Sequence, residues 1–182
     1  MKQKRFGFTL IEILVVISII SVLAGALYAN FADARAESRD KVRKNTLLEM
    51  QVALELYKSQ YGVYPEQGCG AATTWTGPGP HSAVWANNID CPEYIVGLAP
   101  TFISALPIDP GREYQNNTGY LYQVNGTRTA YKLLSYGTVE SDTVDDYNHD
   151  FSRCPTTYGS TQCGATPESN TYAVYSFGAE DW

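Results

Sequence analysis

Residues 8–32 read FTLIEILVVISIISVLAGALYANFA, and the rest of the chain is organised around this stretch. Its only charged residue is Glu12. A helix of about 20 apolar residues crosses a bilayer core, so the stretch is predicted to be a transmembrane helix. No proline occurs before Pro65, and nothing therefore forces the helix to break. We expect one helix over residues 8–61, with an amphipathic second part at 33–61.

Glu12 is the unusual residue of the apolar stretch. An ionisable side chain costs about 2.5–3.5 kcal/mol near the centre of a spanning helix, and it is a functional candidate by default. Cleavage between Gly7 and Phe8 would create a positive α-amino group at nearly the same depth. If helices pack with a small axial offset, that amine and the Glu12 of a neighbouring subunit would neutralise each other in a medium of low dielectric constant.

Residues 4–12 read KRFGFTLIE and lead directly into the apolar run. This arrangement resembles the class III signal of type IV pilins and of the pseudopilins of type II secretion. The resemblance implies that a prepilin peptidase cuts after Gly7 and methylates the new N-terminal residue, Phe8. It also implies that Glu12 guides subunits into a filament. One departure is Ala29, where many family members carry a helix-bending proline.

An ordinary secretory signal peptide is the alternative interpretation of this stretch. The basic residues before Gly7, the apolar run and the small residues 24–26 would also suit cleavage after Ala26. The product would be a secreted or membrane-anchored extracellular binding domain with no filament role. A carboxylate inside the apolar run, the length of that run and the uninterrupted helix beyond it favour the pilin interpretation.

The charge of the chain bears on its topology and partners. Residues 1–7 form a basic leader with Lys2, Lys4 and Arg5, and the net charge of −6 becomes −9 when this leader is removed. A negative chain is a poor partner for nucleic acid. A basic leader stays on the cytoplasmic side of a membrane, which predicts a head, residues 62–182, on the outer side.

The second part of the expected helix changes character along its length. Residues 33–44 carry mixed charges, which we expect either at the membrane surface or subunit contacts, or on a solvated helix face. Apolar residues then recur at helical spacing and predict a stripe covered by a sheet; they are Leu47, Met50, Leu54, Tyr57 and Tyr61. Gly62 is predicted to end the helix, and Pro65 prevents it from resuming.

Three later segments are strand candidates: residues 120–124, 129–134 and 171–176. Aromatic and β-branched residues flank Asn125-Gly126, which is typical of a hairpin. An antiparallel sheet of three such strands on the helix stripe gives an α+β, pilin-like head. Trp75 and Trp85 lie in a long loop and are expected to pin it to the head.

Four cysteines follow the helix, namely Cys69, Cys91, Cys154 and Cys163. They allow three pairings, and disulfides suit a head outside the cytoplasm. Nearest-neighbour pairing, Cys69–Cys91 and Cys154–Cys163, would close one loop in each half of the head. The resemblance also favours Cys154–Cys163, because the family often staples a C-terminal loop in this way.

The sequence offers little that indicates catalysis. Its two histidines, His81 and His149, lie in no nucleophile or zinc motif, so we expect no enzyme. Major pseudopilins bind calcium in a C-terminal loop, and the resemblance makes an acidic patch a candidate calcium site; its members are Asp142, Asp145, Asp146 and Asp150. A solvated acidic loop is the favoured alternative, because the spacing matches no known ligand set such as an EF-hand. No other cofactor is predicted.

These patterns together predict a structural subunit. The resemblance implies a homo-oligomer in a helical filament, with the prepilin peptidase, an inner-membrane assembly platform and the membrane itself as partners, and no specific nucleic acid. It implies residence in the inner membrane with the head outside, followed by a periplasmic or extracellular filament. The segments around Tyr64-Pro65 and Leu106-Pro107 favour a pseudopilus, whereas the disulfides and the longer head favour a pilus.

Overall fold

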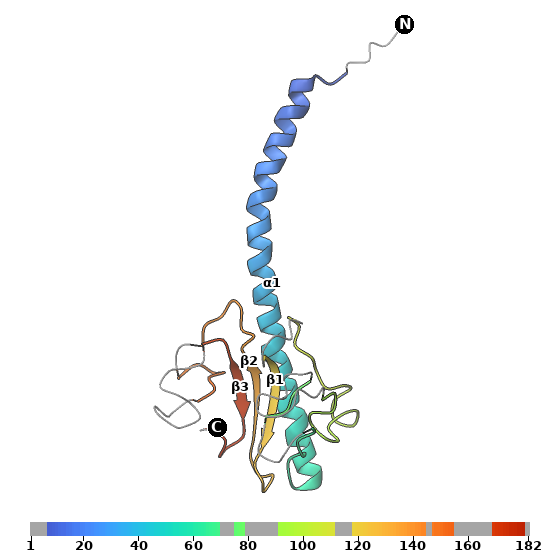
Figure 1. Ribbon diagram of the computed structural model, residues 1–182, viewed down its shortest axis with the longest axis vertical. Coiled ribbons are helices and arrows are strands. Elements are labelled where there is room, and N and C mark those ends of the chain that lie inside the picture. The colour runs from blue at the N-terminus through green and yellow to red at the C-terminus, as the bar shows by residue number, and fades with distance from the viewer. Residues whose placement is uncertain are drawn as a thin grey trace. The chain divides into compact units, whose positions relative to one another are not determined.

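The computed structural model describes residues 7–69, 75–78, 91–111, 118–144, 147–154 and 169–180, without the side chains of 26–30. The chain divides into two compact units, Met1–Ala36 and Glu37–Trp182, and each is described by itself. The helix α1, Leu10–Tyr61, contributes to both units (Figure 1).

In the first unit, α1 begins at Leu10, two residues later than predicted. Its large apolar side chains up to Leu23 are exposed, and Phe8 just before the helix is exposed too. No helix in the described part of the chain combines the length and the apolar character that crossing a membrane demands.

Gly62 ends α1 in the second unit, as predicted. Its φ is +79°, a left-handed conformation that glycine adopts without strain, and its N–H donates to the carbonyl of Lys58 at 2.7 Å. Tyr64 and Pro65 follow as buried residues. The chain thus turns back onto the head directly after the helix.

The head contains a three-stranded antiparallel sheet of order β1-β2-β3 (Figure 1). The strands are β1 (Gly119–Val124), β2 (Tyr131–Tyr136) and β3 (Tyr172–Tyr175). Val124 pairs with Tyr131 at one end of the first ladder, and Lys132 pairs with Tyr175 in the second. The predicted α+β architecture, a long helix against a small antiparallel sheet, is confirmed.

The core lies between α1 and one face of the sheet. Leu47, Met50 and Leu54 are fully buried there, as the predicted stripe requires. Alternate strand residues supply the other side of the core; these are Tyr120, Tyr122, Val124, Tyr131, Leu133, Tyr172 and Val174. The buried stripe ends before Tyr61, which is 54% exposed and whose ring contacts those of Tyr57 and Phe102.

The β1–β2 hairpin differs from its prediction. Its turn runs from Asn125 to Ala130, so β2 begins at Tyr131 and not at residue 129. The left-handed residue is Arg128, with a φ of 57°, rather than one of the Asn125-Gly126 pair. The Asn125 side chain explains the longer turn, because its Oδ1 accepts hydrogen bonds from the N–H groups of Thr129 (2.8 Å) and Ala130 (3.2 Å).

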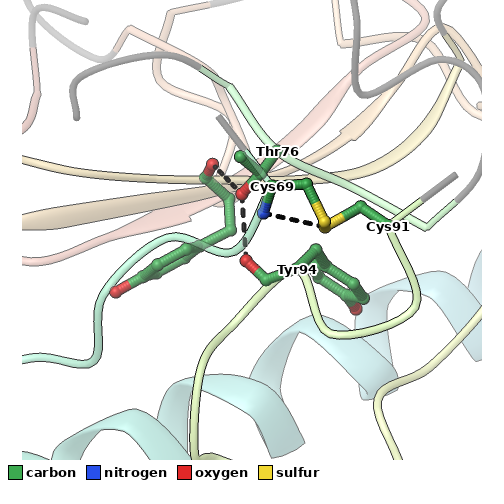
Figure 2. Close-up of a disulfide and its surroundings, with 5 residues drawn as sticks. Cys69, Thr76, Cys91 and Tyr94 are labelled. Atoms are coloured by element: carbon green, nitrogen blue, oxygen red, sulfur yellow. Dashed lines mark hydrogen bonds between the residues drawn. A yellow bond between two sulfur atoms is a disulfide. The ribbon is translucent and has the colours of Figure 1, made fainter. Parts of the chain in front are cut away.

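The predicted disulfide Cys69–Cys91 is present, with Cα atoms 5.7 Å apart (Figure 2). Beside it, the Thr76 hydroxyl donates to the Tyr94 carbonyl at 2.9 Å, and Thr76 forms an isolated bridge to Tyr122 of β1. The disulfide therefore fastens a loop that also touches the sheet.

The tryptophans and the second disulfide were also predicted to attach loops to the head. Trp75 is buried on the outer face of the sheet, with the Arg153 guanidinium 5.8 Å from its ring, as expected of a pinning aromatic. Trp85 lies outside the described residues. Cys154 is disulfide-bonded, but its predicted partner, Cys163, lies outside the described residues, so that pairing stays a prediction.

Candidate processing and assembly site

The predicted cleavage point lies before the helix begins. Gly7 is exposed, and a Cβ at this position would meet nothing within 4 Å. Phe8 is 86% exposed, and α1 starts two residues later. The Gly7–Phe8 bond is therefore free of helical hydrogen bonding, which is the kind of backbone that proteases cut most readily.

Thr9 and Glu12 form a capping box at the start of α1. The Thr9 backbone N–H and hydroxyl each donate to Glu12 Oε2 at 2.7 Å. In return, the Glu12 N–H donates to Thr9 Oγ1 at 3.3 Å. Thr-x-x-Glu directly before an apolar run is the sequence signature of this motif. It satisfies N–H groups at the helix start that otherwise lack partners. The signature is present in the sequence, but the capping box was not predicted.

The side chains around Glu12 are apolar and exposed. Leu10, Ile11, Ile13 and Leu14 each expose half or more of their surface, and the same holds for most large apolar residues up to Leu23. The continuous apolar surface is suited to contact with lipid or with other helices, and Glu12 is the one charged side chain at its end. The predicted processing and assembly residues, Gly7, Phe8 and Glu12, thus lie together at one end of α1.

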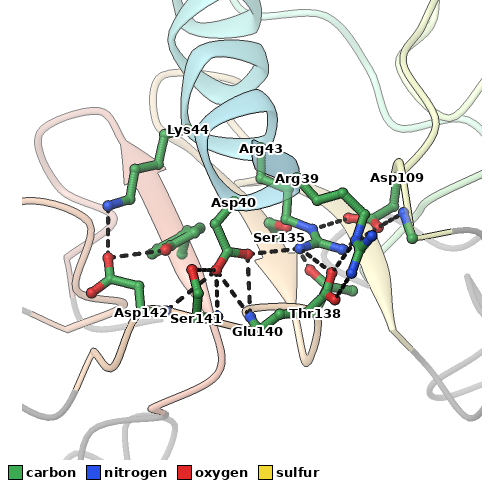
Figure 3. Close-up of polar contacts among 12 residues, drawn as sticks. Arg39, Asp40, Arg43, Lys44, Asp109, Ser135, Thr138, Glu140, Ser141 and Asp142 are labelled. Carbon is green, nitrogen blue, oxygen red and sulfur yellow. Dashed lines mark hydrogen bonds and ion pairs between the residues drawn. The ribbon is translucent and has the colours of Figure 1, made fainter. Parts of the chain in front are cut away.

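A second charged site lies within the head and is organised by Arg43 (Figure 3). We call Asp40, Arg43, Asp109 and Glu140 the Arg43 cluster. The guanidinium donates to Asp40 Oδ1 (2.7 Å), to both oxygens of Asp109 (2.9 Å each) and to Glu140 Oε1 (2.8 Å). Burial opposes the charge of Arg43, but these carboxylates outweigh that effect and raise its pKa.

Asp40 connects the cluster to the segment that follows β2. Its Oδ2 accepts hydrogen bonds from the N–H (2.7 Å) and hydroxyl (2.8 Å) of Ser141, and from the N–H of Glu140 at 3.1 Å. Burial by itself raises the pKa of Asp40, but the hydrogen bonds from Ser141 and Arg43 lower it overall. Arg39 adds a partly exposed ion pair to Glu140.

The Arg43 cluster corrects the prediction for residues 33–44. Asp40 is 3% exposed and Arg43 1% exposed, so these two charges lie neither on a solvated face nor at a membrane surface. The sequence contains a signal for the burial of Asp40 and Arg43. Asp40 and Arg43 continue the spacing of Leu47, Met50 and Leu54 by three and four residues, which places them on the same buried face of α1.

The candidate calcium residues are only partly described. Asp142 pairs with Lys44 Nζ at 2.6 Å and accepts a hydrogen bond from the Tyr172 hydroxyl at 3.0 Å. The Lys44 contact is the main reason that the pKa of Asp142 falls to about 2. Asp145 and Asp146 lie outside the described residues. Among the residues that are described, including Asp150, no group of three or more His, Cys, Asp or Glu could hold a metal ion.

Comparison with known proteins agrees with this geometry. Residues 2–28 match the model of the prokaryotic N-terminal methylation motif. The type II secretion system core protein G of Escherichia coli K12 is 30% identical over 146 residues, which cover 79% of this chain and 90% of that protein. The chain belongs to the type II secretion system core protein G family. This confirms the resemblance inferred from residues 4–12.

Other members of the family cover less of this chain. The core protein G of Vibrio cholerae is 31% identical over 62% of this chain and 70% of its own length. The core protein G of Pseudomonas aeruginosa is 27% identical over 75% of this chain and 85% of its own length. No solved structure matches the chain significantly. Core protein G is a pseudopilin, and the chain is accordingly a structural subunit and not an enzyme.

Proposed function

We propose that this pseudopilin is cleaved between Gly7 and Phe8 by a prepilin peptidase, is methylated on the new Phe8 amine, and polymerises through α1 into the pseudopilus of a type II secretion system. The observation that carries the proposal is the exposed Gly7–Phe8 bond directly before a capped apolar helix whose sequence matches the methylation motif. A type IV pilus is less well supported, because the matching relatives are core proteins G.

Before assembly, residues 8–32 hold the subunit in the inner membrane with the head on the outer side. The exposed apolar side chains of this segment support that placement, together with the basic leader. Helix packing can replace lipid contacts at little cost, because other helices are as apolar as lipid. The filament is therefore a homo-oligomer in the periplasm, built with an inner-membrane assembly platform.

Glu12 gives the assembling helix its register. After cleavage, the Phe8 amine lies near the Glu12 carboxylate of a neighbouring subunit. Each charge then offsets the free-energy cost of burying the other. Thr9 already fixes the position of the Glu12 carboxylate at the helix start. A carboxylate held in place loses little side-chain entropy when a neighbouring amine binds it.

Mass spectrometry of the mature N-terminus tests this function against a secreted binding domain. We expect a chain that begins with N-methylated Phe8. A conventional signal peptidase would leave a chain that begins at Leu27 without a methyl group. The Ala26–Leu27 bond lies within α1, whereas the Gly7–Phe8 bond precedes it. A mature protein that begins at Leu27 would reject the filament proposal.

A further inference from the structure

Asp142 is the candidate calcium ligand with the most contacts among the described residues. Its Oδ2 contacts Lys44 Nζ (2.6 Å) and the Tyr172 hydroxyl (3.0 Å), and the His149 Nε2 is 3.5 Å away. Its Oδ1 accepts a hydrogen bond from the N–H of Thr143 at 2.9 Å. Both oxygens of this carboxylate therefore have partners within the head.

The Lys44 ammonium contacts two aromatic rings as well as the Asp142 carboxylate. The ammonium lies 4.8 Å from the centre of the Tyr172 ring and 5.6 Å from that of Phe151, in addition to its contact with Asp142. A carboxylate and two aromatic faces are the groups that bind an organic cation. Lys44 projects from α1, so the contacts join the helix to the segment after β2 and to β3 (Figure 3).

Calcium does not fit Asp142 in this arrangement. The ion takes six to eight oxygen ligands at about 2.3–2.6 Å, which is the distance that the Lys44 ammonium already occupies. A calcium ion on Oδ2 would meet a positive charge at the closest approach. Asp40, the neighbouring buried carboxylate, is already satisfied by Ser141 and Arg43.

We propose that the Lys44 ammonium occupies the place of a cation at Asp142, so that the segment after β2 is attached to α1 without calcium. Lys44 neutralises Asp142, and one residue earlier on the helix Arg43 neutralises the carboxylates of Asp40 and Glu140. Two adjacent cationic side chains of α1 thereby neutralise the carboxylates of this segment and attach it to the helix, which is the role that a bound metal ion would have in an acidic loop.

Thermal unfolding of the full-length chain in detergent micelles tests the inference. We expect the same Tm, within about 1 °C, in excess EDTA and in calcium at about 5 mM, a concentration that saturates even weak protein sites. Calcium titration calorimetry should show no saturable heat. A rise of Tm by several degrees with calcium, or saturable binding, would overturn the proposal.

Variants of Lys44 separate its charge from its packing. Lys44→Met keeps the length of the side chain and removes the ammonium, and we expect Tm to fall by roughly 3–6 °C. Asp142→Asn should lower Tm as well, and the double variant should lose less than the sum of the two. Lys41→Met is the control, because Lys41 pairs with Glu37 on the exposed face of the same helix. A Lys44→Met protein as stable as the Lys41→Met protein would contradict the proposal.

Discussion

The Arg43 guanidinium and the Asp109 carboxylate form two parallel hydrogen bonds, with Nε donating to Oδ2 and Nη2 to Oδ1, each at 2.9 Å (Figure 3). Both side chains are almost completely buried. This bidentate pair ties the turn that contains Pro107 and Pro110 to α1. Since the same guanidinium also contacts Glu140, one side chain joins the helix to two loops that are distant in sequence.

Loss of the Arg43 charge is expected to destabilise the head strongly. Arg43→Met retains an apolar stem but leaves the buried carboxylate of Asp109 without its bidentate partner and that of Asp40 without its cation. Removal of one member of a buried pair costs about 3–5 kcal/mol. Urea unfolding followed by near-ultraviolet circular dichroism measures the free energy of unfolding.

Arg35→Met provides the comparison for Arg43, because Arg35 lies on the same helix and is exposed. Exposed substitutions usually change stability by less than about 0.5 kcal/mol. Equal free energies of unfolding for the two variants would show that the Arg43 cluster makes no net contribution to stability.

Acid should weaken the head as its carboxylates take up protons. The pKa of Asp142 is about 2 in the folded state against 3.8 ordinarily, and the pKa values of Asp40 and Glu140 are also lowered. A group whose pKa is lowered by folding stabilises the fold above its ordinary pKa, and this contribution disappears as the pH falls through the folded value. We therefore expect Tm to decline between about pH 4 and pH 2.

Asp142→Asn isolates the share of Asp142 in this decline. The variant should be less stable near neutral pH and should lose less between pH 4 and pH 2. Asp142 is one-third exposed, so water screening reduces the size of its effect. A wild-type profile with no slope in this window, or a variant profile parallel to it, would contradict the assignment.

The helix and the sheet could be predicted because their signals are local. Leu47, Met50 and Leu54 repeat at helical spacing, and Gly62 marks the helix end within the same stretch. The hairpin turn was misjudged because the side chain of Asn125, and not the glycine beside it, determines the turn. Side-chain capping of this kind leaves no periodic pattern to detect.

The Arg43 cluster escaped prediction because its partners are far apart in the sequence. Asp109 lies 66 positions after Arg43 and Glu140 lies 97 positions after it. The spacing of Asp40 and Arg43 places them on the buried face of α1, but no local pattern identifies Asp109 and Glu140 as their partners. By contrast, the Gly7, Phe8 and Glu12 assignments came from a contiguous motif, and the methylation-motif match over residues 2–28 includes all three.

Gly62 should resist replacement by residues with a Cβ. Its φ of +79° is unfavourable for alanine, although a Cβ there would meet no neighbouring atom. The left-handed conformation costs roughly 1–2 kcal/mol, so Gly62→Ala should lower the free energy of unfolding by about that amount. Gly126→Ala is the control, since Gly126 has open space and no left-handed φ. If urea unfolding shows equal losses for the two variants, the conformation of Gly62 is not the cause.

Two substitutions of Glu12 separate its charge from its cap. Glutamine can serve as the acceptor in a capping box, so Glu12→Gln should keep the helix start but lose the charge, whereas Glu12→Ala loses both. If pairing with the neighbouring Phe8 amine drives assembly, both variants should lower filament yield about tenfold or more, because an unpaired buried amine costs more than about 1.4 kcal/mol. Filament yield is measured as the pelletable fraction of the periplasm released from cells, with Ser18→Ala as a control on the same apolar segment. Wild-type yield from Glu12→Gln together with loss in Glu12→Ala would assign the role of Glu12 to capping and reject the charge pairing, while methylation at Phe8 would still be tested separately.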